Sequence, residues 1–71
     1  MSYFIVYPGG DRSKLAIINL SDYMRYELDD YAVASRHEWS DDEVEDAVSY
    51  AKKLARENNK EYIGDDDGYL D

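Results

Sequence analysis

The sequence predicts an α+β fold in which a small antiparallel sheet of three to four strands carries one helix on one face. Two observations lead to this prediction. Near the start, two runs of aromatic and β-branched residues flank a turn-forming segment, which is typical of a β-hairpin. Further along, apolar residues recur at three- and four-residue spacing behind a helix-capping signal. The expected element order is β-β-(short segment)-β-α-β.

The hairpin is predicted by the first 20 residues. Residues 3–7 and 15–18 are the two strand-forming runs, and we place the strands at about residues 2–7 and 14–20. Residues 8–11, Pro-Gly-Gly-Asp, are typical of a turn. They are not predicted to bind phosphate, because no helix follows them to offer its N-terminus.

Residues 21–30 fit two structures. Met24 and Leu28 have helical spacing, whereas Met24, Tyr26 and Leu28 also alternate as strand residues do. We favour a turn followed by a short irregular or helical segment. From Tyr31 to Trp39 the alternation of side chains predicts a third strand.

The helix is predicted over residues 41–58. Ser40 and Glu43 match a capping box, and Trp39 and Val44 occupy the positions of a hydrophobic staple. The helix should end near Asn58–Asn59, because asparagine tolerates the left-handed conformation that often follows a helix. Its apolar stripe is narrow and rich in alanine, and comprises Val44, Ala47, Val48, Ala51, Leu54 and Ala55.

The remaining segment, residues 61–71, is expected to form a final strand or a small terminal hairpin, with the last few residues frayed. Residues 1–71 should make a single domain, because neither a linker nor an internal repeat interrupts them. A chain of this length buries only about 60% of the surface that it exposes when unfolded. The core is therefore expected to be thin.

Composition argues against several classes of function. The chain has no cysteine, so no disulfide or thiolate zinc site supports the fold, which fits a reducing compartment. No apolar run approaches the roughly 18 residues of a membrane span, and no signal-peptide pattern is present. We expect a cytoplasmic protein with no membrane contact. Its 17 acidic and 8 basic residues argue against direct binding of nucleic acid, because phosphate contacts are made mainly by Lys and Arg.

The acidic residues are concentrated at the start of the predicted helix, where five of the six residues from Asp41 to Asp46 are acidic. The helix dipole favours one or two carboxylates in a first turn, but five exceed that requirement. Asp42, Glu45 and Asp46 should point away from the apolar stripe, towards solvent or a partner. The competing interpretation is a solvated helix face that keeps a small protein soluble.

Tyrosine is the second notable feature, with eight tyrosines against one phenylalanine. Tyrosine combines an apolar ring with a polar hydroxyl and is enriched at protein interfaces. Tyr50 lies on the flank of the helix stripe, and Tyr26 lies near Glu27, Asp29 and Asp30. Such rings add cation–π attraction to ion pairing. The competing interpretation is that most of these tyrosines are half-buried sheet residues.

No residue set is predicted to be catalytic, to bind a cofactor or to hold a metal. His37 has no accompanying nucleophile elbow or oxyanion loop, so we do not expect an enzyme. The run Asp65-Asp66-Asp67-Gly68 invites a calcium interpretation. It fails the EF-hand pattern, because the chain ends before the required bidentate glutamate.

The leading hypothesis is a noncatalytic binding protein whose acidic, tyrosine-flanked surface occupies a basic, nucleic-acid-binding groove of a larger protein by nucleic-acid mimicry. In composition the chain resembles phage and mobile-element proteins that inhibit host restriction, CRISPR or transcription machinery, although no motif is shared. The alternative is a small structural or accessory domain that forms a homodimer through its sheet. The residues expected to bind the partner are Asp42, Glu45, Asp46, Glu27, Asp29, Asp30, Asp65, Asp66, Asp67, Tyr50 and Tyr26.

Overall fold

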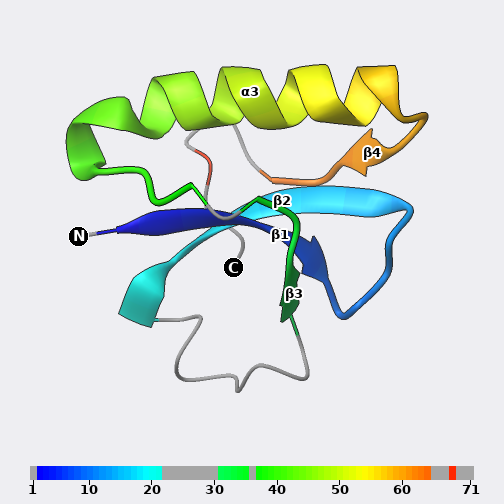
Figure 1. Cartoon of the computed structure of the whole chain (residues 1–71), viewed down its shortest axis with the longest axis horizontal. Helices are drawn as coiled ribbons and strands as arrows, with labels where there is room; N and C mark the ends of the chain where they lie inside the picture. The colour runs from blue at the N-terminus through cyan, green and yellow to red at the C-terminus, as the bar shows by residue number, and fades with distance from the viewer. Residues whose placement is uncertain (1, 22–30, 36, 65–67, 69–71) are drawn as a thin grey trace.

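The computed structural model describes residues 2–21, 31–35, 37–64 and 68, in which one long helix lies across a mixed sheet (Figure 1). The predicted α+β class and element order are confirmed. No helix in the described part of the chain has both the length and the apolar character needed to cross a bilayer. The elements are β1 (Tyr3–Pro8), β2 (Lys14–Asn19), β3 (Tyr31–Val33), the 3-10 turn η1 (Asp41–Glu43), α3 (Val44–Glu57) and β4 (Glu61–Tyr62).

The strands are ordered β3-β1-β2-β4, with the predicted hairpin at the centre. β1 pairs antiparallel with β2, placing Ile5 opposite Ile17, and β3 pairs antiparallel with β1. β4 pairs parallel to β2, so the expectation of a wholly antiparallel sheet is wrong at this edge. The reason is topological: α3 ends near the β1–β2 turn and returns the chain to the start of β2 (Figure 1). A strand leaving that point beside β2 must run in the same direction.

β3 is shorter than the strand predicted from Tyr31 to Trp39. The backbone N–H groups of Ala34 and Ser35 both donate to the carbonyl oxygen of Ile5, at 2.8 and 3.4 Å, and the regular ladder stops there. Pairing with β1 resumes at Trp39, which exchanges backbone hydrogen bonds with Tyr3 at 2.7 and 3.0 Å.

The interruption inserts extra residues into the third strand. Three steps along β1, from Val6 to Tyr3, are matched by six from Val33 to Trp39, so three residues are unmatched. Side-chain alternation cannot reveal such a bulge, because the insertion breaks the register without changing residue types. The bulge returns Trp39 to the sheet directly before the helix begins.

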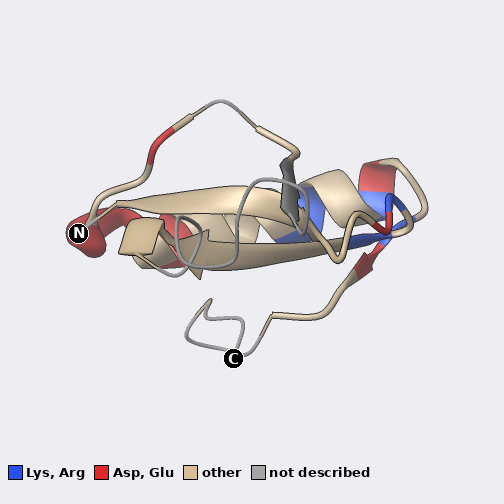
Figure 2. Ribbon diagram, turned by 90° about the horizontal axis from the view of Figure 1, so that it is seen from below, with Lys and Arg blue, Asp and Glu red and all other residues tan. Residues whose placement is uncertain are grey.

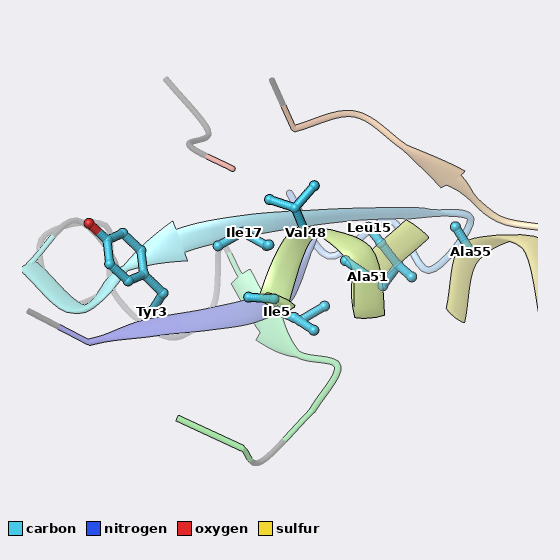
Figure 3. Close-up of a cluster of buried hydrophobic side chains, with 8 residues drawn as sticks. Tyr3, Ile5, Leu15, Ile17, Val48, Ala51 and Ala55 are labelled. Atoms are coloured by element: carbon cyan, nitrogen blue, oxygen red, sulfur yellow. The ribbon is translucent and has the colours of Figure 1, made fainter. Parts of the chain in front are cut away.

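The main core lies between α3 and the central hairpin (Figure 3). Alternate residues of β1 and β2 point at the helix, and the small side chains of Ala47, Ala51 and Ala55 let the helix approach the sheet closely. Because the helix contributes mostly alanine, the sheet supplies most of the bulk. Trp39 and Leu54 are only partly buried at its margin. The sheet residues of this core are Tyr3, Ile5, Leu15 and Ile17.

The opposite face of the hairpin is also buried within one copy of the chain. Val6, Ala16 and Ile18 form a second apolar cluster, and Phe4 packs against it. Both sets of alternating residues are therefore removed from water. Self-association was predicted to use either an exposed edge strand or an apolar sheet face left uncovered by the helix, and these three side chains do not provide such a face.

The C-terminal end of α3 forms a Schellman-type cap, as the asparagine pair predicted. Asn59 has a positive φ of 55°, and the Lys60 N–H donates to the Ala55 carbonyl oxygen at 2.7 Å. The Asn58 side-chain amide and its backbone N–H both donate to the Leu54 carbonyl oxygen, at 2.9 and 3.1 Å. The carbonyl oxygens of Leu54 and Ala55 are thereby paired at the end of the helix.

Replacing Asn59 should change stability in a direction that depends on the new residue. Asn59→Ala is expected to lower the free energy of unfolding by about 1 kcal/mol, because alanine resists the left-handed conformation. Asn59→Gly is expected to preserve or raise it, because glycine adopts that conformation freely. Urea denaturation of both variants measures the difference. Equal stabilities of the alanine and glycine variants would contradict the proposed role of the positive φ.

Several predictions fall partly outside the described residues. Of the ambiguous segment 21–30, only Ser21 is described, and it continues the helical backbone of Leu20. In the predicted 64–68 turn only Gly64 and Gly68 are described. Gly68 is buried with a φ of 81°, and an added Cβ would lie 2.7 Å from a methyl group of Val48, so glycine is required there. The last residues, which were predicted to fray, lie outside the described residues.

Candidate functional site

Six carboxylates gather where the chain enters the helix, and we call this set the acidic end: Glu38, Asp41, Asp42, Glu43, Glu45 and Asp46. The predicted capping box fixes the backbone there. The Glu43 carboxylate accepts hydrogen bonds from the Ser40 N–H at 3.2 Å and from the Ser40 hydroxyl at 3.0 Å. The Glu43 N–H donates to the Ser40 carbonyl oxygen at 2.9 Å and closes the first turn, which is 3-10 rather than α.

These six carboxylates divide into two groups. Glu43 caps the helix, Glu38 accepts from the Ser2 hydroxyl, and Asp41 is engaged in a further interaction. Asp42, Glu45 and Asp46 are exposed and make no hydrogen bond or ion pair with any other residue that the structure describes. The three carboxylates predicted to face a partner are therefore the three left available for one.

The cap makes one pH-dependent contribution to stability. Hydrogen bonds from the Ser40 backbone and side chain hold the pKa of Glu43 below its usual value, with a smaller contribution from His37. A carboxyl whose pKa is lowered on folding stabilises the fold above its unfolded pKa of about 4.5, and this stabilisation is lost as the pH falls through the lower folded pKa.

Glu43→Gln is therefore expected to be less stable than the wild type at pH 7 and to approach wild-type stability below about pH 4. Melting temperatures of the two proteins across this range measure the difference. A gap between them that stays constant with pH would rule out the ionised Glu43 cap.

An aromatic group adjoins the acidic end. The ring of Trp39 lies 5.7 Å from that of Tyr50 and 4.3 Å from that of His37, which meets it edge to face. Tyr50 is 40% exposed and lies one helical turn beyond Asp46. We call His37, Trp39 and Tyr50 the aromatic rim. It places polarisable ring faces beside free carboxylates, which is a favourable setting for lysine and arginine side chains of a partner.

Tyr50 was among the residues predicted to bind the partner, whereas His37 and Trp39 were not. Trp39 was interpreted as a staple residue, and its buried indole N–H has no hydrogen-bond partner among the residues that the structure describes. The alternation in the predicted third strand placed residues 37 and 39 on the same face, but it did not indicate that they adjoin the acidic end. The other predicted partner-binding residues lie outside the described residues: Glu27, Asp29, Asp30, Asp65, Asp66, Asp67 and Tyr26.

The cations of the described residues lie away from the acidic end (Figure 2). They occupy the second half of α3, the segment that follows it and the neighbouring β1–β2 turn. Three carboxylates, Asp11, Glu57 and Glu61, lie among them. We call these cations the basic half: Arg12, Lys14, Lys52, Lys53, Arg56 and Lys60. Charge of the two signs is thus separated along the helix axis, which complements the helix dipole.

The described residues contain no group of three or more His, Asp or Glu side chains that could hold a metal ion. His37 packs on Trp39, and its backbone N–H donates to the Ser35 hydroxyl at 3.3 Å. The prediction that the protein is not an enzyme stays a prediction. The chain matches no known protein family, no curated protein sequence and no solved structure.

Proposed function

We propose that this chain is a noncatalytic binding protein that places its acidic end and aromatic rim against a basic surface of a larger protein, one that normally holds nucleic acid. The observation that carries the proposal is the exposure of Asp42, Glu45 and Asp46 on a capped, rigid helix start, at a distance from the basic half. Carboxylates that are held in place and remain unpaired retain their charge for a cationic partner.

Two physical features support a role in occupying a nucleic-acid groove. The residues of the 3-10 turn rise about 2.0 Å each and those of the α-helix about 1.5 Å, so the five acidic residues from Asp41 to Asp46 have a charge spacing of about 2.1 Å, comparable to the roughly 1.7 Å spacing along duplex DNA. The net charge of −9 opposes direct contact with phosphate and favours fast encounter with a cationic surface. Occupation of the groove would exclude nucleic acid by competition, as expected of a phage or mobile-element inhibitor acting in the cytoplasm.

The proposal is tested by capturing partners from a bacterial lysate on the immobilised protein at low salt, followed by elution with increasing salt. A nucleic-acid-binding protein should elute early in the gradient, because contacts between exposed charges are screened as ionic strength rises. Adding DNA or RNA to the captured complex should also release the partner. Capture that withstands both high salt and competing nucleic acid would refute the proposal.

Light scattering supplies a control for the alternative of self-association through the sheet. The edge strands β3 and β4 have only three and two residues, and short edges pair poorly with another chain. We therefore expect a monomer at all salt concentrations. A dimer that is insensitive to salt would favour the alternative.

A further inference from the structure

The basic half contains a pocket about 20 Å from the acidic end, measured along α3 at 1.5 Å per residue. Its volume is about 210 Å³. It opens between the sheet and the last turn of the helix, beside the β1–β2 turn. The residues that line it are Tyr7, Leu15, Ala34, Leu54, Asn58 and Lys60.

The inner part of this pocket is apolar and the outer part is cationic. Leu15 is buried beneath it, and Ala34 and Leu54 are half-buried at its sides. An apolar cavity of about 150 Å³ is large enough to hold benzene, so this pocket has room for one ring or a branched alkyl group. Drug-sized ligands fill about 300–1,000 Å³, which sets an upper limit on the ligand.

Two cations lie near the ring of Tyr7, one of the residues that line the pocket. The Arg12 guanidinium carbon lies 5.1 Å and the Lys60 ammonium nitrogen 5.2 Å from the centre of the Tyr7 ring. The Lys60 ammonium also donates to the Arg12 carbonyl oxygen, which fixes it at the pocket rim. An ammonium group has three donor hydrogens, so two remain for a ligand.

Asp11 lies near Lys14 and Lys60. Hydrogen bonds from Ser13 hold the pKa of Asp11 below its usual value, and the charges of the two lysines add to this effect. Asp11 accepts from the Ser13 N–H at 2.9 Å and from the Ser13 hydroxyl at 2.6 Å, which holds it in the turn. Two carbonyl oxygens of the last helical turns, those of Leu54 and Ala55, accept hydrogen bonds from Asn58 and Lys60. Among the described residues no carboxylate forms an ion pair with Arg12 or Lys60, so their positive charge is available to an incoming anion.

We infer that this pocket binds a small organic anion, in which a single ring or branched alkyl group enters between Leu15, Ala34 and Leu54 while a carboxylate or phosphate meets Lys60 and Arg12. The inference goes beyond the proposed function, because it uses a different surface of opposite charge. It also assigns a role to Arg12 and Lys60. These two cations lie outside the helix, so the helix dipole does not account for them.

Titration of the isotope-labelled protein with phenylacetate and with phenyl phosphate, followed by amide chemical shifts, tests the inference. Shifts should be confined to residues around the pocket and should saturate with a Kd in the millimolar range, as expected for so small a ligand. The tighter of the two probes identifies the preferred anion. Phenylacetamide, which lacks the charge, and acetate or inorganic phosphate, which lack the ring, should each bind at least about 5-fold more weakly.

Two variants test whether Arg12 and Lys60 themselves contact the ligand or whether the ligand is attracted only by the overall positive charge of the basic half. Lys60→Gln and Arg12→Gln should each weaken phenylacetate binding about 5-fold, whereas Lys53→Gln on the exposed face of α3 should leave it unchanged. Thermal unfolding checks that each variant is folded, and the Arg12 variant leaves the Lys60 hydrogen bond to the backbone intact. Any of three results would overturn the inference: no saturable shifts up to about 20 mM ligand, equal binding of the neutral amide, or unchanged affinity in both the Lys60→Gln and Arg12→Gln proteins.

Discussion

Exchanging Asp42 and Asp46 for lysine is expected to weaken binding of the captured partner about 100-fold. Both side chains are exposed and make no interaction with other described residues, so their removal costs the fold little beyond the helix-dipole contribution. At the interface, two attractive charges become two repulsive ones, and like charges brought together cost several kcal/mol. Adding Glu45→Lys should reduce the affinity further. Affinities measured by titration calorimetry at constant salt test this expectation.

A matched control tests whether partner affinity depends on where the charge is changed or only on the change in net charge. Glu57→Lys with Glu61→Lys changes the net charge by the same four units, from −9 to −5, but at the opposite end of α3. This pair should keep partner affinity within about 3-fold of wild type, apart from a loss of long-range steering. Circular dichroism establishes that both double variants are folded. Equal loss of affinity in both pairs would mean that the partner responds to total charge and not to the acidic end.

Ile17→Ala is expected to have the largest effect on stability, lowering the free energy of unfolding by about 3 kcal/mol or more. Ile17 is 0% exposed and packs between β1 and α3 in the main core. A domain of this length has a total stability of about 4–10 kcal/mol, so the loss is a large fraction of it. The melting temperature should fall by about 15 °C, measured by calorimetry.

Ile63→Ala is the matched control, because it removes the same atoms from a side chain that is 37% exposed. The Ile63 N–H donates to the Leu15 carbonyl oxygen, and the substitution leaves that backbone contact unchanged. We expect a loss of less than about 1 kcal/mol. Similar losses at positions 17 and 63 would contradict the assignment of the core to the space between the hairpin and α3.

The hairpin and the helix were predictable because their signals are local. Strand-forming runs around a Pro-Gly-Gly turn gave β1 and β2 to within about two residues, and the capping box gave the start of the helical segment at Asp41. The asparagine pair gave its end, because a left-handed residue is required directly after the helix. Each of these features depends on contacts between residues only a few positions apart.

The third strand and the direction of β4 were not predictable in the same way. The bulge between Val33 and Trp39 arises because two N–H groups share the carbonyl oxygen of Ile5, a residue distant in the sequence. The parallel pairing of β4 follows from the place where α3 delivers the chain. Neither the bulge nor the parallel pairing of β4 can be recognised from the spacing of residue types in the sequence.

The candidate site, too, was predictable from the sequence in part only. Helical periodicity was enough to predict that Asp42, Glu45 and Asp46 point away from the core, and the structure finds all three exposed. It was not enough to bring His37 and Trp39 beside Tyr50, because the bulge and the packing of α3 on the sheet decide that contact. The pocket in the basic half could not be predicted either, since its lining comes from four separate stretches of the chain.

The fold class, the limits of the helix and the concentration of negative charge at the helix start could all be predicted from the residues alone. These properties follow from the residue types and from hydrogen bonds within a few positions. Long-range packing was needed to bring Arg12, Lys14 and Lys60 beside the cations of the second half of the helix, to bury both faces of the hairpin, and to place Arg12 and Lys60 at the Tyr7 ring beside a pocket. The physical reason is that these arrangements depend on strand order, strand direction and the path of α3 across the sheet, which are set by long-range packing.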